Sequence, residues 1–178
     1  YTARAAAAQM CAQAAIGGRE SRGKIVLVSS IMGQHVLGDA VAYSMAKAAV
    51  IHLGGCLASE LAEKRVNVNV ICPGWMDTEG ERQFDTEATI QQLAPHLPWN
   101  RLGTPAEVGG LAAFLCSAAA DYISGSTFVI DGGYSVDLRP KGIVAHLAVE
   151  SSLRSEERRV GKECRSWWSP VSEVKTEQ

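Results

Sequence analysis

The stretch GKIVLVSSIMGQHVLGDAVAYSMAKAAV, residues 23–50, decides the fold. It opens with a short apolar run over 24–28 that is rich in β-branched side chains and is bounded by glycine and serine. Such a run is typical of a buried parallel strand. A proline-free segment with apolar residues at steps of three and four follows, and it predicts a helix over 41–63. A buried strand followed by a helix predicts one unit of an α/β fold.

Three polar side chains in this stretch are candidates for chemistry. Ser30 follows the predicted strand, at the carboxyl end where open α/β sheets bind ligands. Tyr43 and Lys47 stand four residues apart and therefore share one face of the predicted helix. A tyrosine–lysine pair at this spacing is also common on solvated helix surfaces, but the serine and its strand favour a site.

The trio has the right chemistry to move a proton to or from a carbonyl or alcohol oxygen. A free phenol gives up its proton only near pH ~10. A cation ~4 Å away at an effective dielectric of ~20 contributes about 4 kcal/mol in favour of the phenolate. We therefore expect Tyr43 to be the general acid/base, Lys47 the assisting cation and Ser30 the group that holds the substrate oxygen.

The rest of the chain continues the alternation of strands and helices. Strands are predicted at 24–29, 66–71 and 126–130, and helices at 1–15, 41–63, 85–94 and 105–119. In the last helix Thr104, Pro105 and Glu107 form the pattern of a capping box with proline in the first turn. We expect a buried stripe on each long helix, made of Ala46, Val50, Leu53, Leu57 and Leu61, and of Val108, Leu111, Ala112, Leu115 and Ala119.

Five segments resemble, in order and spacing, the short-chain dehydrogenase/reductase family. They are GKIVLVSSIMG (23–33), AYSMAKAAV (42–50), VNVNVICPGWMDT (66–78), RLGTPAEVGGLAAFLCS (101–117) and YISGSTFVIDGGY (122–134). The resemblance covers about residues 1–136 and implies a Rossmann-type, doubly wound parallel sheet. It also implies that Ser30, Tyr43 and Lys47 are catalytic, and that Tyr43 and Lys47 contact the cofactor as well.

The resemblance further implies a cofactor contact after the strand at 66–71. Pro73, Gly74, Met76 and Thr78 would lie against the nicotinamide end of NAD or NADP, with the Met76 backbone and the Thr78 hydroxyl at the carboxamide. Methionine departs mildly from the family's isoleucine or valine, which does not alter a backbone contact. A Pro-Gly pair after a strand is otherwise read simply as a turn.

The glycine-rich turn with which the family binds pyrophosphate is missing from this sequence, because no GxxxGxG pattern occurs in it. The family's Asn-Ala-Gly segment and its catalytic asparagine are missing too. We therefore expect a fragment that holds the C-terminal half of the sheet, lacks the first half and is inactive alone. The residue that selects NAD or NADP would lie in that missing half.

Three regions are expected along the chain. Residues 1–137 form the partial Rossmann domain, and residues 138–153 are an extension that resembles nothing in the family. Residues 154–178 include RSEERRVGKECRSWWSP (154–170), which resembles the translation of a sequencing-library adapter. This last region is interpreted as adapter read-through or as a disordered tail.

The composition indicates one globular unit: 47% of the residues are hydrophobic, 20% are charged and the net charge is −2. This balance disfavours nucleic acid and acidic membranes as partners, and we expect no apolar stretch long enough to span a bilayer. The cysteines lack CxxC spacing and are read as buried residues of a protein in the reducing cytoplasm. The histidines lack metal-ligand spacing, so no metal site is expected; His35 is either a pocket residue or a solvated loop residue.

The sequence specifies the substrate less sharply than the fold or the catalytic residues. The polar segment 79–100 corresponds to the family's variable substrate loop, and Trp75 and Trp99 either line a pocket or pack the loop onto the body. The sequence around this loop resembles glucose 1-dehydrogenases, and 3-oxoacyl-[acyl-carrier-protein] reductases share the core motifs. We expect an oxidoreductase for a small sugar, alcohol or 3-oxoacyl compound, assembled as a homotetramer; a lyase or epimerase, or a non-catalytic fragment, are the alternatives.

Overall fold

A parallel β-sheet forms the centre of the molecule. The computed structural model describes residues 2–15, 20–35, 40–83 and 86–136, so the predicted extension (138–153) and tail (154–178) lie outside the described residues. The strands β1 (Gly23–Val28), β2 (Val66–Pro73) and β3 (Thr127–Ile130) lie side by side in that order and are all parallel. This confirms the predicted α/β class and the strand positions, and β2 extends two residues beyond its predicted end.

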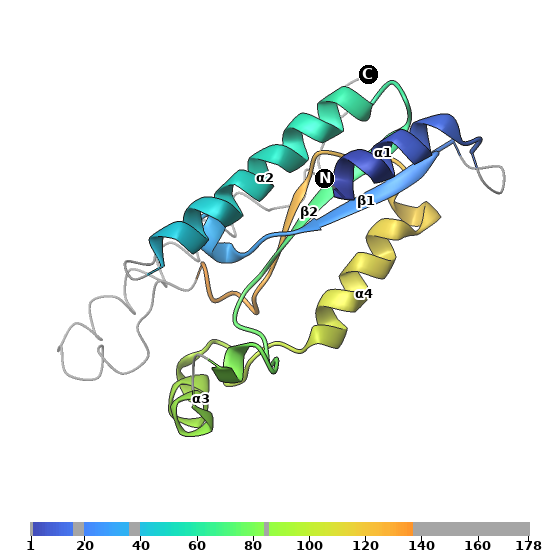
Figure 1. Ribbon diagram of the computed structural model, residues 1–178. Coiled ribbons are helices and arrows are strands. Elements are labelled where there is room, and N and C mark those ends of the chain that lie inside the picture. Colours follow the sequence, from blue (N-terminus) through green and yellow to red (C-terminus); the bar gives the residue numbers. More distant parts are fainter. Residues whose placement is uncertain (1, 16–19, 36–39, 84–85, 137–178) are drawn as a thin grey trace, which may run out of the picture. The chain divides into compact units, whose positions relative to one another are not determined.

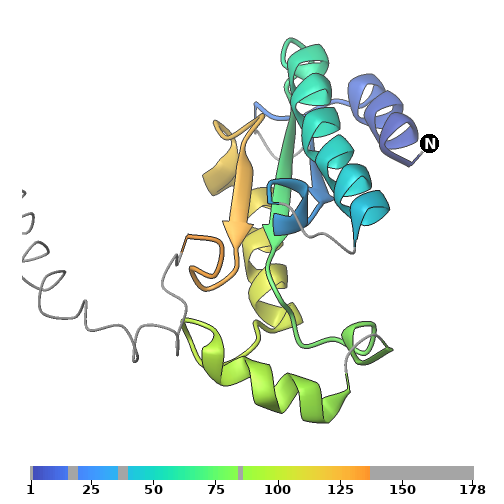
Figure 2. The ribbon, with the colours of Figure 1, turned by 90° about the vertical axis from the view of Figure 1, so that its left-hand side faces the viewer.

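Helices cover both faces of the sheet, as Figures 1 and 2 show. Helices α1 (Thr2–Ala12) and α2 (Val41–Leu61) pack on one face, and α4 (Pro105–Cys116) packs on the other. The alternation of β2 divides its side chains between these two layers. Val68 points to α1 and α2, and Ile71 points to α4.

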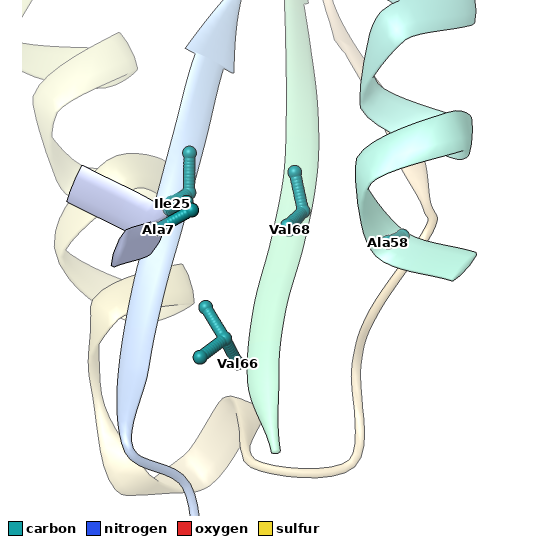
Figure 3. Packing of buried hydrophobic residues seen from close by; sticks show 5 residues of the cluster. All are labelled: Ala7, Ile25, Ala58, Val66 and Val68. Carbon is teal, nitrogen blue, oxygen red and sulfur yellow. The ribbon is translucent and has the colours of Figure 1, made fainter. Parts of the chain in front are cut away.

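The cluster between the sheet and helices α1 and α2 is built from small and β-branched residues. Figure 3 shows five of its buried members: Ala7, Ile25, Ala58, Val66 and Val68. Gly54 brings α2 close to β2, because a Cβ atom at this position would lie 2.3 Å from Cγ2 of Val70. The small residues of α2 therefore set the distance between the helix and the sheet.

The expected stripe of large apolar residues on α2 is only partly present. Leu57 and Leu61 pack against the cluster, but Leu53 is 45% exposed and Ala46 is exposed. The two buried residues of the helix are Gly54 and Ala58. Since small side chains permit the closest approach, they face the sheet and rotate the neighbouring Leu53 away from it.

The α4 layer confirms most of the predicted second stripe. Leu115 is fully buried, and Val108, Leu111 and Ala112 pack around it. Ala119 was expected to be buried but is exposed. The helix ends at Cys116, and a short 3₁₀ helix (Ala118–Ala120) follows, so the change of helical phase buries Ala120 instead.

The start of α4 is held by the predicted capping box. The Thr104 hydroxyl accepts a hydrogen bond from the Glu107 N–H at 3.3 Å, and the Glu107 carboxylate accepts one from the Thr104 N–H at 2.7 Å. Arg101 pairs with the same carboxylate at 2.7 Å. Arg101 therefore helps to shape this turn.

Two buried asparagines in β2 tie the sheet to the segment before β3. The Asn67 side-chain amide donates to the carbonyl oxygens of Asp121 and Ile123, and Asn69 donates to Ile123 and accepts from the Ser126 N–H. Each buried amide is thereby satisfied, which removes the cost of burying polar groups. The alternating VNVNV sequence therefore forms a strand that is covered on both faces.

Short helical segments complete the described chain. Helix α3 (Glu87–Leu93) lies in the expected substrate loop between two 3₁₀ helices, Glu81–Gln83 and Ala94–His96. Another 3₁₀ helix (Ile31–Gly33) begins after Ser29 and Ser30, beyond the end of β1. These short elements surround the carboxyl ends of β1 and β2, where the candidate site lies.

Helix α2 alone among the described helices has the length and apolar composition of a membrane span. The expectation that no apolar stretch would be this long is therefore wrong for residues 41–61. Only 11% of its most apolar window is buried inside the molecule. The buried part, at Gly54 and Ala58, packs on the sheet.

Candidate active site

Ser30 lies just beyond the end of β1, where the sequence placed it. Its extended backbone makes it the N-cap of the 3₁₀ helix Ile31–Gly33, and its hydroxyl oxygen accepts a hydrogen bond from the Met32 N–H at 3.2 Å. A serine hydroxyl that accepts one bond keeps its own proton for donation. Ser30 can therefore donate a hydrogen bond to an oxygen atom bound beside it.

Tyr43 and Lys47 lie on the first turns of α2 and share one face of the helix, as the spacing predicted. The Lys47 ammonium is 5.5 Å from the centre of the Tyr43 ring and donates a hydrogen bond to the Val28 carbonyl at 3.3 Å. The Tyr43 side chain is 49% exposed, and its hydroxyl makes no hydrogen bond within the described part of the chain. The phenol is thus free for a ligand, with a cation next to its ring.

Ser29 was not singled out from the sequence, yet it fixes the position of Lys47. Its buried hydroxyl donates to the Lys47 carbonyl at 2.7 Å, and its N–H donates to the Ile71 carbonyl at 2.8 Å. These two bonds join β2, the end of β1 and the second turn of α2. The two adjacent serines were visible in the sequence. Only the contacts of each hydroxyl in the fold show that the one of Ser29 is structural.

A cavity of about 600 Å³ brings the candidate residues together. Ser30 and Tyr43 both line it, although they come from a strand end and a helix start 13 residues apart. Its other walls are Ile31, Met32, Ala40, Gly74, Trp75, Glu81, Leu93 and Tyr134. The volume lies within the range of about 300–1,000 Å³ found for small-molecule sites.

The turn after β2 approaches the turn after β3 very closely. A Cβ atom at Gly74 would lie 2.5 Å from Cβ of Asp131, so only glycine fits here. Burial would raise the pKa of Asp131, but hydrogen bonds from Ser135 and from the Gly133 N–H outweigh it, and the pKa lies below its ordinary value. Gly74 and Asp131 together hold two loops at one edge of the cavity.

The backbone beyond Gly74 fits the carboxamide of a nicotinamide. The residues flanking Met76 pair with Gly103: the Gly103 N–H donates to the Trp75 carbonyl, and the Asp77 N–H donates to Gly103. The N–H and C=O of Met76 point the other way and make no hydrogen bond to any described residue. A carboxamide needs one donor and one acceptor, and this peptide edge offers both.

Thr78 adds a third polar group to the same edge. Its hydroxyl oxygen accepts a hydrogen bond from the Glu81 N–H at 3.1 Å, which leaves its proton for donation. Pro73 ends β2 directly before this turn. Pro73, Gly74, Met76 and Thr78 therefore lie in one short segment at the carboxyl end of the sheet, as the sequence led us to expect.

A second cavity of about 380 Å³ lies next to the first and shares Trp75 and Tyr134 with it. Its walls include Trp99, whose ring lies 5.4 Å from the Arg101 guanidinium. Trp75 and Trp99 thus both line a cavity, and Trp75 also packs against the buried cluster of Ile90, Leu97 and Leu102, so it has both of the roles left open by the sequence. His35 is exposed and lines neither cavity, which favours the solvated loop position.

Glu81 and Tyr134 were not predicted as site residues. Glu81 was only one of several polar residues in the variable loop, and Tyr134 was only the end of a family motif. They reach the cavity because the loop after β2 and the turn after β3 meet at the same edge of the sheet. Nothing local in the sequence distinguishes them from neighbouring loop residues.

The sequence is similar to a known family and to several known proteins. A family model described as "Enoyl-(Acyl carrier protein) reductase" matches residues 2–135. The chain belongs to the short-chain dehydrogenase/reductase family. Within this family it is 38% identical, over 115 residues, to the 3-oxoacyl-[acyl-carrier-protein] reductase MabA of Mycobacterium tuberculosis, an alignment that covers 65% of this chain and 46% of the relative.

Solved short-chain dehydrogenase/reductase structures have the same fold. The 3-hydroxyacyl-CoA dehydrogenase type-2 of Mycobacterium avium matches with a TM-score of 0.65 and 36% identity, over 78% of this chain and 51% of that one. A gluconate 5-dehydrogenase of Burkholderia cenocepacia, in complex with NADP and tartrate, matches with a TM-score of 0.66 and 31% identity, over 76% and 51%. The chain therefore spans about half the length of the family members that it matches.

Proposed function

We propose that the complete protein is an NAD(P)-dependent oxidoreductase that transfers a hydride between nicotinamide and a carbonyl compound or secondary alcohol. One observation carries this proposal: Ser30 and Tyr43 line a single cavity, with the Lys47 ammonium beside the Tyr43 ring. Membership of a family of reductases and dehydrogenases supports the redox class. The bound NADP in the gluconate 5-dehydrogenase structure supports the type of cofactor.

The three side chains divide the proton transfer between them. In the direction of reduction, Tyr43 donates its phenolic proton to the carbonyl oxygen as this oxygen gains negative charge. In the direction of oxidation, the alcohol loses its hydroxyl proton to the Tyr43 phenolate and its carbon-bound hydrogen as hydride. Ser30 donates a hydrogen bond to the same oxygen, and the Lys47 ammonium places a positive charge beside the Tyr43 ring.

The cofactor would be held at the edge of the sheet beside these residues. We propose that the Met76 backbone and the Thr78 hydroxyl bind the carboxamide, that Pro73 and Gly74 form the turn beneath it, and that Lys47 reaches the ribose. When bound, NAD or NADP supplies or accepts the hydride. The protein's own part is to orient the substrate and to move the proton.

Replacement of Tyr43 tests the proposal directly. In the complete protein, Tyr43→Phe removes the transferable proton but keeps the ring beside Lys47, so we expect kcat to fall by about 10²–10⁴-fold with cofactor affinity largely retained. Turnover would be followed by nicotinamide absorbance with a panel of sugars, alcohols and ketones. Tyr122→Phe is the matched control, because Tyr122 is fully exposed and lines neither cavity. Full turnover by Tyr43→Phe would refute the assigned role.

We further propose that these 178 residues alone neither bind dinucleotide tightly nor turn over substrate. The chain spans about half of its relatives' length, and its sequence has no glycine-rich GxxxGxG turn for the pyrophosphate. Calorimetric titration with NADH and NADPH checks this, and binding with a micromolar dissociation constant would contradict it.

We also propose a homotetramer in the cytoplasm. Helix α2 presents an apolar surface, with Val41 61% exposed and Met45 68% exposed, which suits burial against another subunit. The four described cysteines are free thiols, which suits a reducing compartment. Sedimentation of the complete protein would test the assembly, and a monomer at micromolar concentration would contradict it.

A further inference from the structure

The cavity that holds Tyr43 is mostly apolar and carries a single charged side chain among its described lining residues. Ile31, Met32 and Leu93 supply apolar walls, and Glu81 is the charged residue. Lys47, whose ammonium lies beside the Tyr43 ring, is not part of the lining. A bound substrate would therefore meet one fixed negative charge besides the hydroxyls that perform the chemistry.

Glu81 is held in place from two sides. Its N–H donates to the Thr78 hydroxyl at 3.1 Å, and its Oε1 accepts a hydrogen bond from the Trp75 indole at 2.5 Å. Its Oε2 makes no hydrogen bond to the residues that the structure describes. An ionised carboxylate only accepts hydrogen bonds, so this oxygen can bind donors and repels other anions.

Besides Tyr43, two lining residues of this cavity are aromatic. Trp75 is oriented by its bond to Glu81, and Tyr134 contributes a second ring with its own hydroxyl. Such residues offer a flat apolar face together with a polar edge. A compound with several hydroxyl groups on a compact carbon skeleton can pack its carbon atoms on these rings and donate hydrogen bonds to the carboxylate. A simple hydrocarbon chain would leave the carboxylate without a hydrogen-bond donor.

We propose that Glu81 determines specificity by binding the hydroxyl groups next to the reacting carbon, and that the substrates are neutral polyhydroxy compounds, that is, sugars or sugar alcohols. This inference rests on the proposed function, since it places the reacting oxygen between Ser30 and Tyr43. It disfavours sugar acids and acyl thioesters: the former add a negative charge beside Glu81, and the latter provide it with no donor. Trp75 acts as a positioning residue for the carboxylate.

The test compares D-sorbitol, its carboxylate counterpart D-gluconate, cyclohexanol and acetoacetyl-CoA with the complete protein and saturating cofactor, which is oxidised for the three alcohols and reduced for acetoacetyl-CoA. We expect the wild-type protein to have its highest kcat/KM with sorbitol. For Glu81→Gln, the ratio of kcat/KM for sorbitol to that for cyclohexanol should fall about tenfold to a hundredfold, mainly through KM, because a hydrogen bond to a charged group is lost. The preference for sorbitol over gluconate should fall as well.

Glu79→Gln is the matched control. Glu79 lies two residues before Glu81 and carries the same charge, but its side chain is exposed and lines neither cavity. It should leave both ratios unchanged. Glu81→Lys supplies a second variant, which should reverse the preference in favour of gluconate. Thermal unfolding of each variant confirms that the comparison is made on folded protein.

The outcomes separate this inference from the proposed function. If the wild-type protein turns over a substrate in a manner that requires Tyr43, but prefers gluconate or acetoacetyl-CoA, the specificity inference is overturned and the redox function stands. The same holds if Glu81→Gln leaves both ratios unchanged. If no panel compound is turned over, or if Tyr43→Phe remains fully active, the proposed function fails and this inference fails with it.

Discussion

Two adjacent serines show how single residues take different tasks at this site. Ser29 is buried and donates to the Lys47 carbonyl, so it anchors α2 to the sheet. Ser30 caps a 3₁₀ helix and lines the cavity that Tyr43 also lines. One step along an extended backbone turns a side chain to the opposite side. The first hydroxyl is therefore structural, and the second is available to a ligand.

At the residue scale, the capping box predicts a pH-dependent stability. Hydrogen bonds from Arg101 and Thr104 lower the pKa of Glu107 from 4.5 to about 2. Because the folded-state pKa is the lower one, the ionised carboxylate stabilises the fold above pH 4.5, and this contribution is lost as the pH falls toward 2. Thermal unfolding should show Glu107→Gln to be less stable than wild type at pH 7.

The difference in thermal stability between wild type and Glu107→Gln should become progressively smaller below pH 4.5. The exposed Glu63 makes no ion pair with the described residues, so Glu63→Gln serves as the control and should follow the wild-type curve. A gap between Glu107→Gln and wild type that is as large at pH 2 as at pH 7 would contradict the assigned cause. The capping interaction would then depend on shape rather than on charge.

At the scale of the element, α2 is defined by where its small residues lie. Gly54 and Gly55 are neighbours, but only Gly54 faces the sheet. An added Cβ would meet Val70 at 2.3 Å in the first case and nothing within 4 Å in the second. The two positions therefore separate the effect of packing from that of helix propensity.

Substitution of the two glycines by alanine should change stability in opposite directions. Gly54→Ala forces the helix away from a rigid core residue, and overpacking of this kind costs about 1–3 kcal/mol, more than the gain in helix propensity. Gly55→Ala should raise the free energy of unfolding by up to about 1 kcal/mol, because alanine favours the helix. Urea denaturation measures both, and equal shifts for the two variants would contradict the packing described for Gly54.

At the scale of the whole molecule, the sheet separates reactive from unreactive thiols. Cys72 is fully buried near the carboxyl end of β2, whereas Cys56 and Cys116 are exposed on α2 and α4. The expectation that all the cysteines are buried is therefore wrong for these two. Both lie on the outward faces of helices, where a small apolar residue needs no partner from the core.

Thiol labelling should follow this division. Burial raises the pKa of the Cys72 thiol, and hydrogen bonds with Ser29 and Ser30 offset this only in part, so the thiol stays protonated and shielded near neutral pH. Mass spectrometry after brief alkylation at pH 7.5 should find Cys116 modified and Cys72 unmodified. Denaturant should expose Cys72 to the reagent. Modification of Cys72 in the folded protein at the rate of Cys116 would contradict its place in the core.

The sequence by itself determined the parallel strands, the helices between them and the grouping of Ser30, Tyr43 and Lys47 near one strand end. These features depend on local patterns, namely β-branched runs, helical spacing and capping residues, which act over a few neighbouring positions. The boundaries differ by a few residues, as for α1, which ends at Ala12 rather than at residue 15. Local patterns specify the type of an element more sharply than its last turn.

Only the tertiary structure decided which side chains share the cavity and which face of α2 meets the sheet. Glu81 and Tyr134 are more than 50 residues apart, and they meet because parallel strands end at one edge of the sheet and deliver their loops to the same place. Gly54 faces the sheet and Leu53 does not, because close packing depends on the fit between surfaces and not on hydrophobicity alone. Contacts between distant segments depend on the whole packing arrangement, and no local stretch of sequence encodes that.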